Sequence, residues 1–437
     1  MAFRVVWKPH RGGACSDCRR RGPGAHRPGG GSEAASRRPR PASSRCLPDF
    51  ASGEETPHSG YHWDGARGRF MEGWYFKVAA PSGSFAFMYS IENPNSWDPS
   101  AGVGAQVMGP KDSYMLQYSK DTRRFWADGK KLELGCAFRL RESGPYPSGM
   151  SEKGDFERRV ERGFQVSSSW HQGHLTLESR GVGGHIEPSV RECSWAYETR
   201  RVHGWGNSTG RQQATAGLLA ALPVFEPHWQ ILMSHGLSSG WIKWGDELHE
   251  FKDAPSYSEK NWGEGFPKRW FWLQCNTFGD EECTSLTAGG GRRTLPFLFG
   301  QDEDVALIGI HHAGRFIEIV PWNGEVCWKV SPWGSWAVKG RSGRIRVELE
   351  ATTRSSGTVL RAPTVEGLIP VCKDTFEGSL RMRVWEDGEL IIDRKSETAA
   401  LEVGGGPWWD TWVGDAEMKE PLRSLTSGLT DFEAPLM

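Results

Sequence analysis

Residues Pro255–Gln274, PSYSEKNWGEGFPKRWFWLQ, are the stretch from which the fold is best inferred. The first half is rich in residues that favour turns, such as Pro255 and Gly263, and we expect it to form a tight loop. The second half, Lys268 to Phe278, is aromatic and alternating, which is typical of a strand. The stretch therefore predicts a loop that delivers its side chains to the start of a β-strand.

Two carboxylic acids, Glu259 and Glu264, lie among the aromatic residues of this stretch. Burial against aromatic rings raises the pKa of a carboxyl group, which keeps its proton available near neutral pH. Glu259 is therefore a candidate acid catalyst. The plainer alternative is that the two glutamates cap the loop or pair with the neighbouring basic residues, which are Lys260, Lys268 and Arg269.

The composition outside this stretch predicts an all-β protein with few helices. The chain has 437 residues with 55 Gly and 22 Trp, and turn residues interrupt it often, which favours many short strands in a sandwich or barrel. His58–Val78 runs into an aromatic strand that should form a hairpin with Phe85–Ile91. The further strand candidates are Tyr114–Tyr118, Phe125–Ala127, Cys136–Leu140, Gly163–Ser168, His174–Glu178, Trp229–Ser234, Ser239–Trp244, Val305–His311, Phe316–Pro321, Trp336–Val338, Arg344–Ala351, Leu380–Trp385 and Glu389–Ser396.

The second half of the chain resembles a restart of the first. Arg269–Thr277, RWFWLQCNT, echoes Gly73–Ala79, GWYFKVA, and each segment follows a Gly-rich loop that carries a Glu and a Trp. This echo indicates two similar β-domains that arose by duplication. The expected divisions are a leader at 1–50, domains at 56–253 and 254–415 with a boundary near Asp253, and a tail at 416–437.

The leader has an unusual charge. Residues 1–50 contain ten Arg and one Lys against three acidic residues, so they carry +8, whereas the rest of the chain carries −9 of the total of −1. An Arg-rich, acid-poor segment without an apolar core is typical of an organelle transit peptide. An ordinary disordered tail is the alternative.

Several classes of function lack support in the sequence. The near-zero net charge gives no electrostatic basis for binding nucleic acid, and no apolar run reaches the length of a transmembrane helix. The Cys and His residues do not have zinc-ligand spacing, and the tandem His311 and His312 would point to opposite faces of a strand. Gly404–Gly406 lacks the context of a nucleotide-binding loop. We expect no metal site and no cofactor.

Four segments resemble a known family: HSGYHWDG at His58–Gly65, FMEGWYFKV at Phe70–Val78, the long run from Gly236 to Asn276, and LEVGGGPWW at Leu401–Trp409. On these segments the chain is similar to plant and cyanobacterial tocopherol cyclases. The resemblance spans most of the chain from Thr56 to Trp412, without the leader, the polar middle and the tail. It implies two lipocalin-like antiparallel β-barrel or sandwich domains side by side, distantly similar to carotenoid hydratases.

The resemblance also implies a reaction. Tocopherol cyclases belong to vitamin E biosynthesis in the plastid and close the chromanol ring of a prenylated hydroquinol with a phytyl tail. A proton reaches the less substituted carbon of the first side-chain alkene, and the neighbouring phenol oxygen captures the tertiary cation. Such a site needs a dry acid, a wall that tolerates positive charge, a proton acceptor and a long apolar trough.

The resemblance and the residue types together give the candidate site. Glu259 is the expected acid, and Tyr257 shares its face if the segment is extended. The reserve acids are Glu264 and Asp374. Trp262, Trp270 and Trp272 are expected to face the cation. A second cluster in the first half should bind substrate or accept the phenol proton, and it comprises His58, His62, Asp64, Glu72 and Trp74.

The substrate is a lipid, so we expect peripheral attachment to a lipid surface, such as a plastoglobule or the inner envelope, through Trp408 and Trp409. Two rival functions stay open at this point. A lipocalin-like carrier of quinols or carotenoids would need the aromatic trough but no acid. A sugar-acting enzyme could use Glu259 and Glu264 as paired carboxylates, although many Trp residues lie in apolar strands.

Overall fold

The computed structural model describes residues 56–405 and 414–417, with gaps at 66–67, 95–97, 178–187, 208–211, 218–226, 281, 295–301 and 331–332. The expected leader at residues 1–50 lies outside the described residues. So do Trp408, Trp409 and nearly all of the expected tail.

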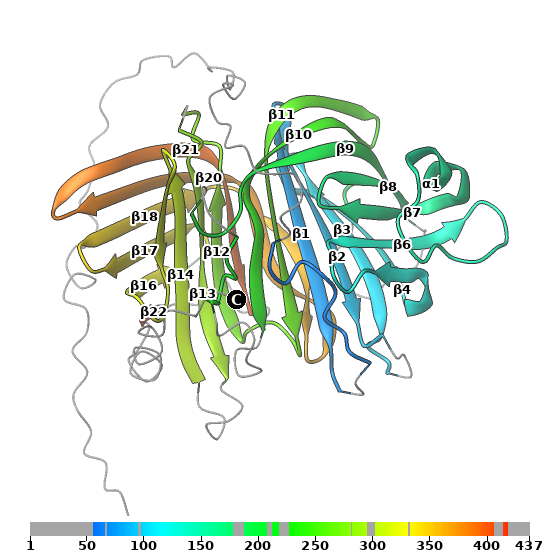
Figure 1. Ribbon diagram of the computed structural model, residues 1–437, viewed down its shortest axis with the longest axis horizontal. Coiled ribbons are helices and arrows are strands. Elements are labelled where there is room, and N and C mark those ends of the chain that lie inside the picture. Colours follow the sequence, from blue (N-terminus) through cyan, green and yellow to red (C-terminus); the bar gives the residue numbers. More distant parts are fainter. Residues whose placement is uncertain are drawn as a thin grey trace, which may run out of the picture. The chain divides into compact units, whose positions relative to one another are not determined.

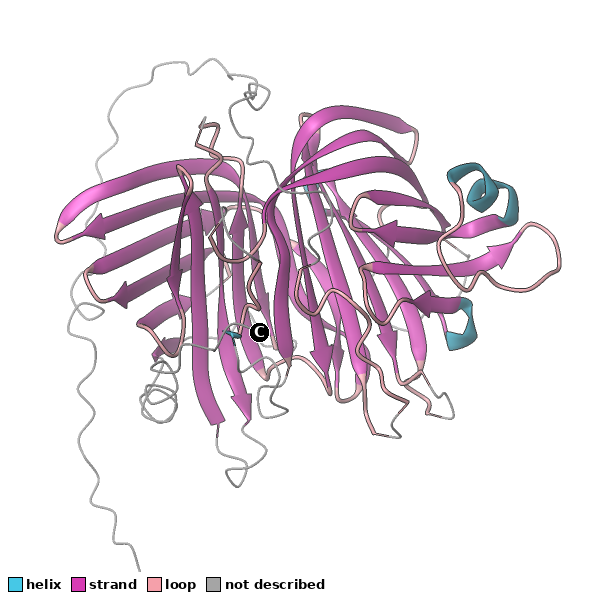
Figure 2. Ribbon diagram, in the orientation of Figure 1, coloured by secondary structure: helices cyan, strands magenta, loops and turns pink. Residues whose placement is uncertain are grey.

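The described part is almost entirely built of β-strands (Figure 2), which confirms the all-β fold class. Its helices are α1 (Lys153–Arg159) and the 3-10 turns η1 (Pro110–Asp112) and η2 (Thr122–Arg124). None of the helices in this part has the length and apolar character needed to cross a bilayer.

The first sheet has eleven antiparallel strands in the order β4-β3-β2-β1-β11-β10-β9-β8-β7-β6-β5 and is strongly curved (Figure 1). Strands that follow each other in the chain pair with each other, except for β4 and β5, which form the two edges of the sheet, and β11 also pairs with β1. The strands are β1 (Met71–Ala80), β2 (Gly83–Glu92), β3 (Gly102–Gly109), β4 (Ser113–Ser119), β5 (Phe125–Ala127), β6 (Glu133–Leu140), β7 (Val160–Ser167), β8 (Trp170–Thr176), β9 (Glu192–His203), β10 (His228–Trp244) and β11 (Glu247–Gly263).

The second sheet repeats this pairing scheme, in the order β15-β14-β13-β12-β21-β20-β18-β17-β16-β22, with β19 also paired to β20. Its first strand, β12, pairs with the late strand β21 as β1 pairs with β11. The strands are β12 (Arg269–Cys275), β13 (Ser285–Thr294), β14 (Asp302–His312), β15 (Arg315–Ile319), β16 (Glu325–Val330), β17 (Ser335–Ser342), β18 (Ile345–Thr353), β19 (Thr358–Thr364), β20 (Gly367–Glu386), β21 (Glu389–Gly404) and β22 (Gly414–Glu417).

The expected hairpin at the start of the fold is confirmed, because β1 and β2 pair from Met71↔Glu92 to Ala80↔Gly83. The first sheet continues through β11 to Gly263, ten residues past the boundary that the sequence suggested at Asp253. Two glycine-rich strands, β3 and β13, were not predicted.

The structure contradicts the loop expected in the first half of Pro255–Gln274. Residues up to Gly263 form the end of β11, which is bonded to β1 on one side and to β10 on the other. The backbone hydrogen bonds of two neighbouring strands outweigh the local turn preference of these residues, since β-propensity depends strongly on context. The strand expected in the second half is confirmed as β12.

Strand alternation sends side chains from β1 into two different cores. Trp74, Phe76 and Val78 pack inside the first sheet, whereas Tyr75 and Lys77 point to the second sheet. On β12, Phe271 and Leu273 enter a core inside the second sheet in the same way. A third core lies between the two sheets and includes the indoles of Trp270 and Trp272.

Candidate active site

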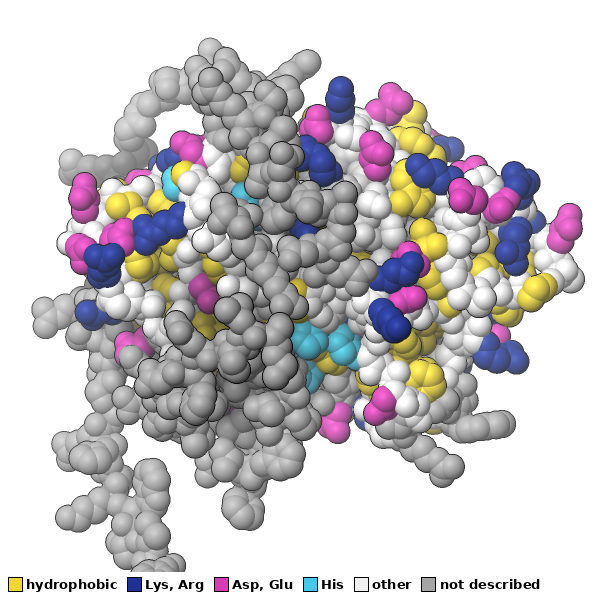
Figure 3. All heavy atoms as spheres, viewed as in Figure 1, with side chains coloured by type: hydrophobic (Ala, Val, Ile, Leu, Met, Phe, Trp, Pro, Cys, Tyr) yellow, Lys and Arg dark blue, Asp and Glu magenta, His cyan; other side chains and the backbone are white. Residues whose placement is uncertain are grey.

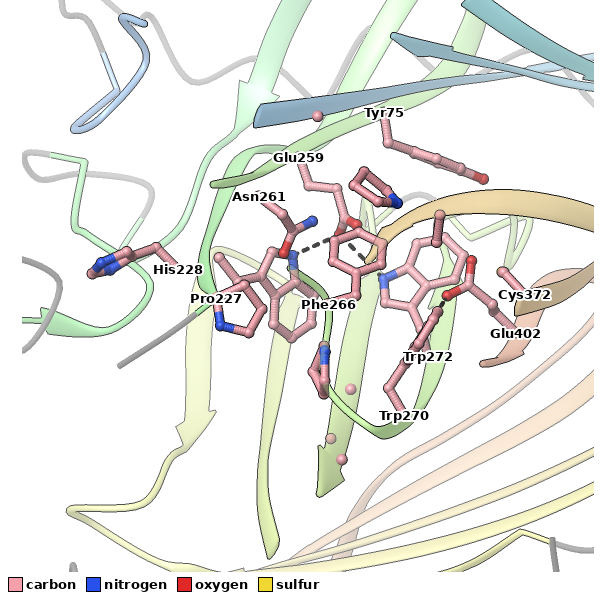
Figure 4. A pocket seen from close by; sticks show the side chains of 18 of the residues that line it. Tyr75, Pro227, His228, Glu259, Asn261, Phe266, Trp270, Trp272, Cys372 and Glu402 are labelled. Atoms are coloured by element: carbon pink, nitrogen blue, oxygen red, sulfur yellow. Dashed lines mark hydrogen bonds between the residues drawn. The ribbon is translucent and has the colours of Figure 1, made fainter. Parts of the chain in front are cut away.

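A largely apolar cavity opens between the two sheets (Figure 4), whereas the interior of each sheet is filled by its own core. The first sheet contributes to the lining from β1, β2, β3, β10 and β11, the second sheet contributes from β12, β13, β14, β19, β20 and β21, and connecting segments complete it. The aromatic residues expected around the acid thus belong to a site between the two sheets. Its polar groups include Glu259, Asn261 and Glu402.

Glu259 points from β11 into this cavity and is only 8% exposed. One carboxyl oxygen, Oε2, accepts all three of its hydrogen bonds: from Tyr257 Oη at 2.5 Å, from Trp229 Nε1 at 2.9 Å and from Trp272 Nε1 at 3.2 Å. The structure therefore brings together the expected acid, its expected tyrosine partner and one of the expected tryptophans. Trp229 was not predicted. Its ring reaches Glu259 because Gly289 leaves room, since a Cβ there would come within 2.7 Å of the indole.

Burial raises the pKa of Glu259 to about 7, against the opposing effect of hydrogen bonds from Tyr257 and Trp229. Within the described part of the chain, the second oxygen, Oε1, has no hydrogen-bond partner. Because Oε2 is fully used as an acceptor, a proton on the group is best placed on Oε1. The carboxyl is therefore positioned to be protonated at neutral pH and to present that proton to the cavity.

Glu402, on β21, is a second carboxyl in the cavity lining that the sequence did not single out. Its Oε1 accepts a hydrogen bond from the indole N–H of Trp270. Gly404 permits this contact, because a Cβ there would come within 1.9 Å of the Trp270 ring. The signal that could have revealed Glu402 was the position of LEVGGG at the end of the second half, where it corresponds to SEKNWG in the first.

The two reserve acids do not line the cavity. Glu264 follows β11 and is exposed, and its backbone carbonyl accepts a hydrogen bond from Arg69 Nε at 3.1 Å. Asp374 is fully buried on β20 beside Glu402, with which it pairs in register. Burial raises the pKa of Asp374 well above its usual value, and the nearby Glu402 raises it further. Asp374 can thus influence Glu402 but does not face the cavity.

Most of the expected cluster from the first half lies on the opposite face of the first sheet. Residues 257 and 259 share one face of β11, so Lys260 and Trp262 point the other way. There Lys260 Nζ forms an ion pair with Glu72 on β1, and both side chains are fully buried. His62 Nδ1 lies 3.3 Å from the same carboxylate.

Trp262 is likewise not a wall of the cavity, contrary to the expectation from the sequence. Its ring stacks on His62 with 3.9 Å between ring centroids, on His228 at 4.9 Å and on His58 at 5.4 Å. Of these residues, His228 alone belongs to the cavity lining. The stacked rings therefore contribute to the cavity lining only through His228.

The last two predicted residues are also apart from Glu259. Asp64 is exposed in the segment before β1. Trp74 belongs to the core of the first sheet and is also one of the residues that line the cavity, and Lys260 Nζ lies 5.4 Å from its ring centroid. In the described part of the chain, no group of three or more His, Cys, Asp or Glu side chains could hold a metal ion.

Glu72→Gln should separate stability from catalysis. The change leaves Lys260 buried without its counter-ion, which typically costs about 3–5 kcal/mol of unfolding free energy. We expect a clear fall in Tm but unchanged turnover per folded molecule, because the pair lies on the face opposite the cavity. The double variant Glu72→Leu with Lys260→Met is the control and should recover much of the stability. A large loss of turnover at an unchanged Tm would instead support a role of Glu72 as a proton acceptor in the reaction.

Fold and site together define a two-sheet antiparallel β-protein with a protonatable carboxyl in an aromatic-lined apolar cavity. The family model described as "Tocopherol cyclase-like" matches residues 68–405. The chain belongs to this family and is an enzyme of that type.

Named relatives agree with this assignment. The chain is 47% identical over 403 residues to "Tocopherol cyclase, chloroplastic" of Zea mays, covering 87% of this chain and 84% of the relative. It is 46% identical over 401 residues to "Probable tocopherol cyclase, chloroplastic" of Oryza sativa subsp. japonica, with the same coverage of 87% and 84%. Among solved structures, the crystal structure of CghA aligns with 84% of this chain and 97% of its own, at 10% identity and a TM-score of 0.47, which is too distant to support an argument.

Proposed function

We propose that this protein closes the chromanol ring of tocopherols from prenylated hydroquinols that carry a phytyl tail. The observation that carries the proposal is Glu259, a buried carboxyl whose pKa is raised to about 7 and whose Oε1 is free to present a proton to an apolar cavity. A carrier of quinols has no need for such a group. The identity to named tocopherol cyclases supports the same substrate class.

Ring closure starts with proton transfer. The Oε1–H bond of Glu259 breaks and a C–H bond forms at the less substituted alkene carbon, which leaves a tertiary cation. The phenol oxygen then forms a C–O bond to the cationic carbon and releases its proton. No electrons are exchanged with the protein and no group leaves, so the residues of the site supply only proton transfer, charge stabilisation and shielding.

The aromatic side chains around Glu259 suit a cationic intermediate. Trp272 and Trp229 lie within hydrogen-bonding distance of Glu259, so their rings border the point where the proton is delivered. Tyr75 contacts Trp272 edge to face, with 5.3 Å between ring centroids. A cation over an indole face gains on the order of 1–2 kcal/mol. The same rings exclude water, which would otherwise trap the cation as a tertiary alcohol.

Product analysis tests this function directly. The protein would be incubated with methyl-phytyl-hydroquinol under reducing conditions in deuterated water. A cyclase should yield the chromanol with deuterium at the ring carbon next to the closed centre. A carrier would return the hydroquinol unchanged, and that result would overturn the proposal.

We further infer that the protein acts in the plastid at a lipid surface. The Arg-rich residues 1–50 and the "chloroplastic" label of both relatives support plastid import. Among the described residues, the face in Figure 3 mixes acidic, basic and apolar side chains, so this face offers no surface of a single charge for attachment to a plastoglobule or envelope membrane. Val365 is 73% exposed in the turn between β19 and β20, two strands that line the cavity.

Val365→Asp should weaken access to substrate in lipid. Inserting a charge where a valine enters the acyl boundary costs about 1 kcal/mol or more, so we expect turnover with substrate in phosphatidylcholine vesicles to fall several-fold. Turnover with detergent-solubilised substrate should not change. Leu390→Asp is the matched control, because Leu390 is 47% exposed beyond the other end of β20. Equal losses in both variants would remove the special role of Val365.

A further inference from the structure

The two sheets place a glutamate at the same structural position. In the first sheet, Glu259 on β11 pairs in register with Tyr75 on β1. In the second sheet, Glu402 on β21 pairs in register with Trp272 on β12. β1 and β12 are equivalent strands, and so are β11 and β21, because each sheet repeats the same pairing order.

The contacts between the sheets support this equivalence. Tyr75 and Trp272, the two register partners, touch each other with 5.3 Å between ring centroids. Two residues further along the same strands, Lys77 Nζ donates a hydrogen bond to Gln274 Oε1 at 2.8 Å. Equivalent positions of β1 and β12 therefore meet across the interface, and the two glutamates face one cavity from opposite sheets (Figure 4).

Both carboxyl groups accept a hydrogen bond from an indole of β12. Trp272 donates its indole N–H to Glu259, and Trp270 donates its indole N–H to Glu402. Residues i and i+2 on one face of a strand are about 6–7 Å apart. The two carboxyl groups are thus bound by neighbouring indoles on one wall of the cavity.

The surroundings of the two groups differ. The pKa of Glu402 is raised by burial, but hydrogen bonds from Trp270 and Cys372 favour its charged form. A charge on Glu402 in turn raises the pKa of Glu259 and of Asp374. Two nearby carboxyl groups in an apolar site do not both ionise readily, so one acts as acid and the other as base.

We propose that Glu402 is the base of the reaction and accepts the proton of the ring hydroxyl as its oxygen attacks the tertiary carbon. This role rests on the proposed function. The phenol O–H bond breaks, the C–O bond forms, and the proton binds Glu402 while Glu259 is left ionised. When the product leaves, Glu402 releases its proton to solvent and Glu259 takes one up, so each turnover is balanced without another reactant.

Glu402→Gln tests the role, because the amide oxygen can still accept the Trp270 hydrogen bond but cannot take a proton. We expect turnover to fall by ~10²-fold. The wild-type pH–rate profile should have an acidic limb from the base, and this limb should disappear in the variant. The alkaline limb, from Glu259, should move to lower pH because a neighbouring negative charge is lost. A substrate with a more acidic, fluorinated ring should recover part of the rate.

A second variant keeps the carboxyl. Trp270→Phe removes the indole N–H that favours the charged form of Glu402, so the acidic limb should move to higher pH. Glu318→Gln is the control, since Glu318 also accepts an indole N–H, from Trp205 at 2.8 Å, but does not line the cavity. If Glu402→Gln kept the wild-type turnover and both limbs of the pH–rate profile, only the assignment of Glu402 as the base would be overturned. Absence of chromanol with the wild-type protein would instead overturn the proposed function.

Discussion

Glu259→Gln is expected to lower turnover by ~10²-fold or more while the protein stays folded. Glutamine keeps the size of the side chain and an oxygen that can accept hydrogen bonds from Tyr257 and Trp229, but it cannot deliver a proton to carbon. Substrate binding should change little, because the apolar lining supplies most of the affinity. Product formation under saturating substrate and binding of the hydroquinol by fluorescence quenching would measure the two effects separately.

The pH dependence gives this prediction a second readout. The active form of Glu259 is protonated, so wild-type turnover should fall as pH rises through about 7. The same raised pKa destabilises the fold at high pH. The stability that this carboxyl contributes is complete below its pKa in the unfolded chain and is lost as the pH rises through its pKa in the folded protein. At pH 8 the Gln variant should therefore be more stable than wild type, by at most about 3 kcal/mol.

The opposite outcome would identify a structural glutamate. If Glu259 only supported the fold, Glu259→Gln would lower Tm and leave turnover per folded molecule intact. Glu318→Gln serves as the matched control here as well, because it alters a partly buried, indole-bound glutamate outside the cavity lining. It should affect stability without affecting the rate.

Trp272→Leu is the second large effect that we expect. Loss of the ring face over the cation should slow turnover by about 10-fold or more and divert part of the product to the tertiary alcohol. Trp272→Phe keeps a ring face but loses the N–H that donates a hydrogen bond to Glu259. The alkaline limb of the pH–rate profile of this variant should therefore move to higher pH, and little alcohol should form. Chromatographic analysis of chromanol and alcohol gives the ratio.

A matched control separates this effect from loss of packing. Trp328→Leu makes the same change in the core of the second sheet, where the indole packs on Phe271 and does not line the cavity. It should lower Tm without forming alcohol. If Trp272→Leu gave chromanol alone at the wild-type rate, the ring would have no part in stabilising the cation.

The sequence predicted several strands in which large side chains alternate, but it missed others of that kind, such as β9 and β16, and it missed the glycine-rich β3 and β13. The aromatic run of β1 was recognised because Trp74, Phe76 and Val78 recur with a period of two. The strand β13, SLTAGGGRRT, was missed because its glycines suggest turns, whereas in the fold Gly289 makes space for the ring of Trp229. A glycine that makes room for an aromatic ring can be recognised in the sequence only when the ring that fills the space is known.

Glu259, Tyr257, Trp270 and Trp272 could be named from the sequence because they lie within one short stretch of resemblance. The same stretch also suggested Trp262, which the fold turns away. Alternation along an extended segment would have excluded it, but the turn-rich composition hid the strand. Here the chemistry of the residues was clear from the sequence, and the direction of their side chains was not.

By itself, the sequence determined the fold class and the family and indicated Glu259 as a candidate acid, since composition, periodicity and local motifs are properties of neighbouring residues. The tertiary structure alone decided that the cavity lies between the sheets and that Glu402 joins Glu259 there, although 143 positions separate them. It also decided that Glu72 neutralises Lys260 on the far face. The cavity and its two carboxyl groups depend on the packing of one sheet against the other, and the ion pair depends on the pairing of β1 with β11, so both bring together side chains that are distant in the chain.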